Sequence, residues 1–274
     1  SQQFEFILGI FLLGLLITSL IFKTFTAYKQ IQFIQMREYS IGKRLVEGYL
    51  HQSYEWFLSR HSADLGKTIL SEVQQVVIRG MNSLFELIAK GLLTIALLTL
   101  LIIVDPIVAL IVASTLTAIY VLIFSFFRTF IHRLGKKSLL NNKIRFTLVG
   151  ESFGAIKEIK VGGLEETYIK SFSNCAEAYA RAQTFSQLVS ILPRYILEII
   201  AFGGMILILL YITLQSGSLN DSLPIISLYI FAGYRLMPAL QQIYSSFVQI
   251  SFIGPSLKEL FVDLRNLKSR TLTT

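Results

Sequence analysis

The chain has 274 residues, of which 53% are hydrophobic and only 15% are charged, and its mean hydropathy is +0.62. This composition is too apolar for a soluble globular domain and is typical of a protein with several membrane-spanning helices. The single cysteine, Cys175, excludes an intrachain disulfide, and no Cys/His cluster has the spacing of a metal site. The net charge of +8 fits loops beside anionic lipid, and nucleic-acid binding is not indicated because no recognition fold accompanies the basic residues.

Five apolar segments are long enough to cross a hydrocarbon layer of about 30 Å as helices. The pair Asp105-Pro106 predicts a tight turn between the second and third segments, and residues 215–224 predict a turn between the fourth and fifth. We therefore predict an all-α membrane protein, with spans at approximately 4–22, 82–104, 107–127, 188–214 and 223–245.

Two long segments, 23–81 and 128–187, separate these spans. Both have apolar residues at three- and four-residue spacing, which predicts helices that continue far out of the bilayer. Each pattern breaks near its middle, at 53–66 and at 154–163, before a further amphipathic stretch leads back to the membrane. We expect two helical hairpins that project from the membrane.

The basic residues indicate which side these hairpins occupy. Of the 25 Lys and Arg residues, 22 lie in 23–81, 128–187 and the tail 254–274, whereas the two short turns carry none. Because basic residues accumulate on the cytoplasmic side of membrane proteins, we predict that both hairpins and the C-terminus are cytoplasmic.

Local sequences then carry a resemblance to a known family. YEWFLSRHSADLGKTILSEVQQV (54–76) and GESFGAIKEIKVGGLEETYIKSF (150–172) resemble the two intracellular loops of ABC exporters. LPRYILE (192–198) and SLYIFAGYRLMPALQQI (227–243) are similar to the PglK-type flippases, which move lipid-linked oligosaccharides across the bacterial inner membrane.

This resemblance implies an ABC exporter-type transmembrane helix bundle over residues 1–260, with 261–274 beginning the connection to an ATP-binding domain. It implies that the family's first span and the ATP-binding domain lie outside this sequence, and that ATP and Mg²⁺ bind there, while this chain holds no cofactor. The expected protein is a multi-pass homodimer in the bacterial inner membrane, in contact with membrane lipids. As an ABC-type ATPase translocase, it would flip a lipid-linked glycan.

Two alternatives stay open at this stage: an ABC exporter of another amphipathic substrate, such as a lipid, peptide or drug, and a secondary transporter. Ion coupling normally needs acidic residues near the bilayer midplane, and no span centre holds one. Gly66-Lys67-Thr68 is not a Walker A sequence, because position 61 is His where that motif needs Gly.

By the same resemblance, the hairpin tips are coupling helices that dock on the ATP-binding domain. The first tip offers Tyr54, Glu55, Trp56 and Phe57, and exposed aromatic side chains of this kind indicate a partner. The alternative is an aromatic patch buried inside the protein. The expected contacts of the second tip are Ile156, Ile159 and Val161.

Arg235 is the most informative single residue, because a charge near the middle of a span costs at least about 2.5 kcal/mol. Its own helix has no acid one turn away. The resemblance implies that Arg235 lines a polar cavity and binds the substrate's pyrophosphate, and the alternatives are an interhelical ion pair or snorkelling.

Three further positions match the family's cavity residues: Arg194, Lys23 and Gln242. An ion pair with Glu198, one turn later, would also explain Arg194, and Lys23 has the position of a snorkelling anchor at a span end. Gln242 stands where the family has a further arginine, so it can hydrogen-bond a phosphate or sugar but adds no charge. For Lys90, the spacing favours a structural pair with Glu86.

Overall fold

The computed structural model describes residues 2–104, 106–214 and 219–268. The side chains of 207–235, and of some neighbouring positions in the same part of the bundle, lie outside this description. The described residues form helices and short connections with no strand, in agreement with the predicted all-α class. The order is α1 (Gln2–Leu50), α2 (Tyr54–Leu58), α3 (Ser62–Lys67), the π-helical turns η1 (Thr68–Glu72) and η2 (Gln75–Arg79), α4 (Gly80–Val104), α5 (Pro106–Gly154), α6 (Ile156–Gly162), α7 (Glu165–Leu214) and α8 (Leu219–Lys268).

Four of these helices are much longer than a membrane is thick. α1 and α5 have 49 residues each, and α7 and α8 have 50. At 1.5 Å per residue, 49 residues extend about 74 Å, more than twice the roughly 30 Å hydrocarbon layer. Each helix can therefore cross the bilayer and continue well beyond it, as the sequence predicts.

Three helical stretches among the described residues are long and apolar enough to span a membrane: Phe4–Leu50, Ser62–Ile103 and Thr117–Gly154. They contain the first three predicted spans, except for residue 104 and the first part of 107–127. The fourth and fifth predicted spans lie on α7 and α8, largely at positions whose side chains are not described.

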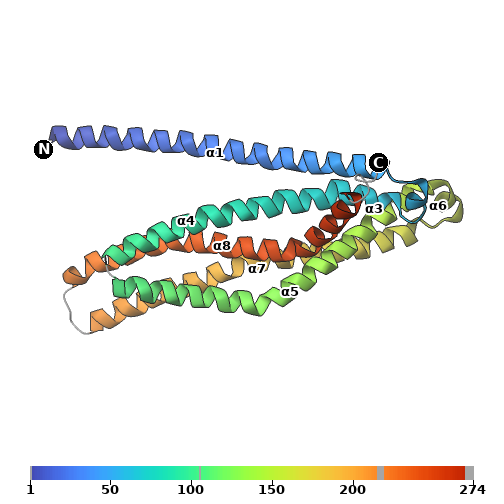
Figure 1. Ribbon diagram of the computed structural model, residues 1–274. Helices are drawn as coiled ribbons and strands as arrows, with labels where there is room; N and C mark the ends of the chain where they lie inside the picture. Colours follow the sequence, from blue (N-terminus) through green and yellow to red (C-terminus); the bar gives the residue numbers. More distant parts are fainter. Residues whose placement is uncertain (1, 105, 215–218, 269–274) are drawn as a thin grey trace.

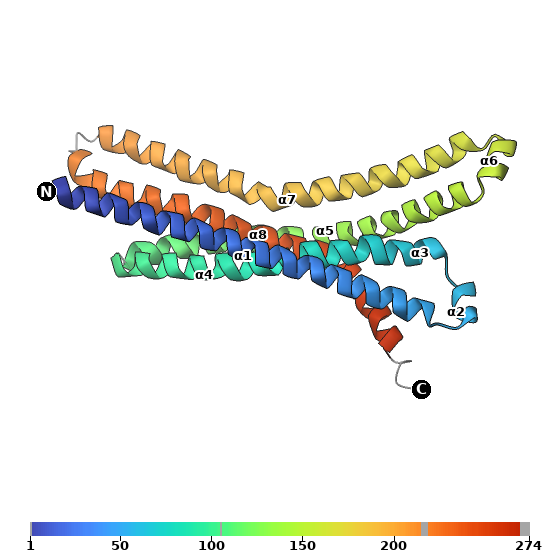
Figure 2. The ribbon, with the colours of Figure 1, turned by 90° about the horizontal axis from the view of Figure 1, so that it is seen from above.

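The main bundle is built around α8, which packs against α4, α5 and α7, while α5 also packs along α7 (Figure 1). Ile131 on α5, Leu197 on α7 and Val248 and Phe252 on α8 are buried together in its core. Gly135 on α5 lies directly against the backbone of Phe252, so these two helices approach closely. α7 bends near its middle, where Pro193 interrupts its hydrogen bonding (Figure 2).

α1 lies apart from this bundle along most of its length (Figure 1). Only its C-terminal half is anchored, where Ile34, Leu45 and Tyr49 pack against η2 and the end of α8. Its apolar N-terminal half, from Phe4 to Phe25, is exposed throughout. In a membrane protein such a surface faces lipid or a further helix.

Both hairpin tips lie at the same end of the molecule (Figure 2). The second tip follows the sequence closely: α5 ends at Gly154, and Gly163 adopts a left-handed conformation, with φ of 61°, that closes α6. The first break is shorter than predicted, because helix resumes at Ser62 and Gly66 lies within α3. Likewise, α8 begins at Leu219, before the predicted end of the turn at Pro224.

Candidate functional site

The first tip divides its aromatic residues between the interior and the surface. Trp56 packs 5.4 Å from the Tyr49 ring, and the Arg60 guanidinium lies 4.5 Å from the Trp56 ring. Phe57 meets Trp56 edge to face. Tyr54, by contrast, is 77% exposed. Trp56 and Phe57 are therefore partly buried against the rest of the protein, and Tyr54 is the outward-facing aromatic residue of this tip.

Glu55 is exposed beside Tyr54 on α2, and the second tip shows a similar division. Val161 is 83% exposed and Ile156 is also exposed, whereas Ile159 is buried and holds α6 against the rest of the hairpin. Lys160 pairs with Glu165 at 3.0 Å across the turn into α7. Hydrogen bonds from its own backbone N–H and from Lys160 lower the pKa of Glu165.

A polar network lies behind the first tip and ties it to two long helices. Lys67 is only 1% exposed and its Nζ lies 3.4 Å from Glu259 Oε1 on α8. Asp64 pairs with Lys143 on α5 at 2.8 Å. Both ion pairs start on α3, so they connect this helix to α5 and α8.

The same network contains a buried carboxylate. Glu72 is almost fully buried, and its Oε1 lies 3.4 Å from Asn142 Nδ2 on α5. Asn142 also donates to Ser71 Oγ at 2.9 Å. Lys67 and Glu72 thus belong to helical packing, and Gly66-Lys67-Thr68 forms part of a helix rather than a phosphate-binding loop.

The predicted cavity residues occupy different environments. Lys23 is exposed on the apolar N-terminal half of α1. Arg194 Nε donates to Glu198 Oε1 at 2.7 Å, which confirms the local pair that the spacing predicted. Lys90 and Glu86 also approach to 4.0 Å as expected. The side chain of Arg235 lies outside the described residues, although its backbone belongs to α8.

Gln242 is half-buried on α8. It lies two residues before Tyr244, which is buried in the core cluster of α5, α7 and α8. Arg194 on α7 lies three residues before Leu197 of the same cluster, and its side chain is 55% exposed.

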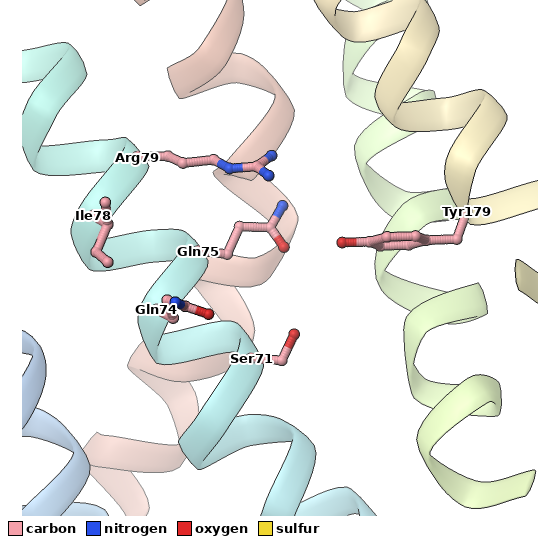
Figure 3. Close-up of a pocket in the computed structure, with 6 residues that line it drawn as sticks. All are labelled: Ser71, Gln74, Gln75, Ile78, Arg79 and Tyr179. Atoms are coloured by element: carbon pink, nitrogen blue, oxygen red, sulfur yellow. The ribbon is translucent and has the colours of Figure 1, made fainter. Parts of the chain in front are cut away.

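A polar cavity that the sequence analysis did not predict lies between the two hairpins (Figure 3). It is lined by Ser71, Gln74, Gln75, Ile78, Arg79 and Tyr179, from the η1 to η2 region and from α7. Ser71, Gln75 and Arg79 are four residues apart, so helical geometry places them on one face. This polar face next to an apolar span could have been recognised from the sequence.

This arrangement of long helices, paired tips and membrane-length apolar segments agrees with a comparison with known families. The family described as ABC transporter transmembrane region matches residues 3–242. The chain belongs to this family. It is thus the transmembrane domain of an ABC exporter and a multi-pass membrane protein, of a type that generally works with a nucleotide-binding domain and often as a dimer.

Proposed function

We propose that this ABC transporter transmembrane domain flips a lipid-linked oligosaccharide, or a related glycolipid, across the bacterial inner membrane with energy from ATP. The observation that carries the proposal is the presence of polar residues within apolar segments of α7 and α8. Arg194 lies on α7 and Gln242 on α8, and Arg235 precedes Gln242 by seven residues, about two helical turns, on α8. Basic and amide groups within spans suit a ligand with an anionic pyrophosphate and sugar hydroxyls.

In the proposed mechanism, ATP bound to two nucleotide-binding domains brings them together, and the hairpin tips of a homodimer follow. Tyr54 and Val161 are the outward-facing groups of the two tips and would enter grooves on these domains. The ion pairs of Lys67 with Glu259 and of Asp64 with Lys143 would carry the motion into α8 and α5. The cavity would then turn from the cytoplasmic to the outer side.

Reconstituted proteoliposomes test the substrate assignment. The full transporter should flip a fluorescent lipid-linked oligosaccharide when ATP is supplied, and Arg235→Ala should reduce this rate strongly without unfolding the protein. Arg235→Lys should retain part of the activity, because the charge survives although the bidentate guanidinium is lost. Lys90→Gln is the matched control, since Lys90 has a local partner in Glu86.

The outcomes separate the alternatives. ATP-dependent flipping of phospholipids or drugs, with no transport of the glycolipid, would favour an exporter of another amphipathic substrate. Transport driven by an ion gradient without ATP would favour a secondary transporter. Normal glycolipid transport by Arg235→Ala would remove that residue from the substrate site.

Coupling is tested at the tips. Tyr54→Ala combined with Val161→Ala should preserve ATP hydrolysis while transport falls, because both side chains are exposed and contribute little to folding. Trp56→Ala is a different test, since Trp56 packs on Tyr49 and Arg60 and its loss should lower stability as well. Normal transport in the Tyr54 and Val161 double variant would contradict a coupling role for these tips.

A further inference from the structure

The cavity between the hairpins has the form of a binding site. Its volume is about 230 Å³, which at roughly 30 Å³ per water corresponds to about eight waters or a phosphate group with part of its ester. Figure 3 shows Gln75 and Arg79 reaching from one helix toward the gap, and the Tyr179 hydroxyl pointing into it from α7 on the opposite side. Gln75 and Arg79 are the ends of η2, and π-helical turns occur frequently at functional sites.

The hydrogen bonds around the cavity leave donors free to point into it. Arg79 Nη1 donates to Gln183 Oε1 at 2.8 Å, which fixes the guanidinium and leaves its other N–H groups available. Gln183 Nε2 donates to Tyr179 Oη at 3.1 Å, so the hydroxyl hydrogen of Tyr179 is not used by that bond. Ser71 Oγ likewise accepts a hydrogen bond from Asn142, and that bond does not use the hydroxyl hydrogen of Ser71.

The charged residue that lines the cavity is basic. Arg79 lines it, and the Arg145 guanidinium lies 4.5 Å from the Tyr179 ring. No carboxylate lines the cavity, and the nearby Glu72 contacts Asn142 instead. A group of free donors beside two guanidinium ions is suited to an anion, and an arginine fork is particularly suited to phosphate.

The position of the cavity indicates where such a phosphate comes from. Arg79 directly precedes α4, three residues before the predicted span 82–104, and Tyr179 lies nine residues before the span 188–214. With the hairpins on the cytoplasmic side, the cavity is at the level of the lipid headgroups of the inner leaflet, where anionic lipids are concentrated.

We propose that this cavity is an anionic-lipid site, in which Arg79, Tyr179, Gln75 and Ser71 bind the phosphate of a headgroup from the cytoplasmic leaflet. The site lies between the hairpin built on α3, η1 and η2 and the hairpin built on α7. A bound headgroup therefore bridges the two elements that must move during transport, and it favours conformations that keep them together. This proposal is independent of the glycolipid assignment.

The test is lipid binding by the intact protein in nanodiscs of phosphatidylcholine, with phosphatidic acid titrated in and bound lipid measured by native mass spectrometry. Arg79→Gln should weaken phosphatidic acid binding by roughly tenfold or more, since hydrogen bonds to charged groups are the strong ones. Tyr179→Phe should weaken it by a smaller factor while keeping the ring that Arg145 covers. Arg133→Gln, which removes an exposed arginine of α5, is the matched control and should bind as the wild type does.

A second variant separates binding from folding. Gln183→Leu breaks the hydrogen bonds to Arg79 and Tyr179 but keeps the charge of Arg79 and the hydroxyl of Tyr179, so this variant should retain binding within a few fold. Equal losses in Gln183→Leu and Arg79→Gln would mean that Arg79 only ties α7 to η2, and would overturn the site. Wild-type affinity in Arg79→Gln would overturn it too. Thermal stabilisation by inorganic phosphate that depends on Arg79, without phosphatidic acid binding, would overturn the lipid as the source of the phosphate.

Discussion

The close approach of α5 and α8 makes Gly135 the position where one added methyl group has the largest predictable effect. A Cβ at Gly135 would lie 3.1 Å from the carbonyl carbon of Phe252 and 3.4 Å from its Cα, and it would overlap the carbonyl oxygen. Carbon atoms prefer a separation of 3.5–4.0 Å, so the contact to the carbonyl carbon is short by about 0.4–0.9 Å. The obstacle is backbone, which cannot rotate away as a side chain can.

The expected free-energy change follows from two opposing terms. Overpacking a core destabilises the folded protein by about 1–3 kcal/mol. Replacing glycine by alanine inside a helix stabilises it by about 0.5–1 kcal/mol. Because the whole of α8 must shift to admit the methyl group, we expect the upper part of this range, a net loss of about 2 kcal/mol for Gly135→Ala. For a chain of this size that corresponds to a drop of roughly 4–8 °C in melting temperature.

Thermal unfolding of the purified protein in detergent, followed by size-exclusion chromatography of the soluble fraction, measures this drop. Gly66→Ala is the matched control, because Gly66 lies in the helix of the other hairpin and a Cβ there would meet nothing within 4 Å. It should match the wild type or exceed it slightly. If Gly135→Ala melts at or above the temperature of Gly66→Ala, the close contact between α5 and α8 does not exist.

The polar network and the tips give two more predictions. Glu259→Gln should destabilise the protein by about 3 kcal/mol because it leaves the buried Lys67 without its ion-pair partner. Lys67→Met should cost much less, since Glu259 is 43% exposed and water can solvate it; a larger loss in Lys67→Met by the same thermal assay would reverse this assignment. In a Cys175→Ser background, cysteines at Tyr54 and Val161 should react with a membrane-impermeant maleimide in inverted vesicles and not in intact spheroplasts, and labelling from the outer face would refute the cytoplasmic placement of the tips.

Local spacing was enough to predict the features that depend on one helix. The pairs Arg194 with Glu198 and Lys90 with Glu86 are four residues apart, so helical geometry alone brings them together. The long helices and the second tip followed from apolar periodicity and from the glycines at its turn.

Features that join distant segments could not be predicted in this way. Lys67 and Glu259 are 192 residues apart, and Arg79 and Gln183 are 104 apart. No pattern in either segment specifies its partner, because the pairing depends on how the two hairpins are placed side by side. For the same reason the sequence could not predict which aromatic residue of the first tip packs inward. In the structure, Trp56 packs inward because it contacts Tyr49 and Arg60.

The central position of α8 has a consequence for biogenesis. α4, α5 and α7 all pack against this helix, and the anchored half of α1 also reaches it, yet it is the last of the described helices to leave the ribosome. Until α8 is made, Gly135 and the faces of the earlier helices that pack on α8 have no partner, and Lys67 has no Glu259 to neutralise it. Although α5 can already pack along α7, the bundle therefore stays incomplete until α8 has been translated.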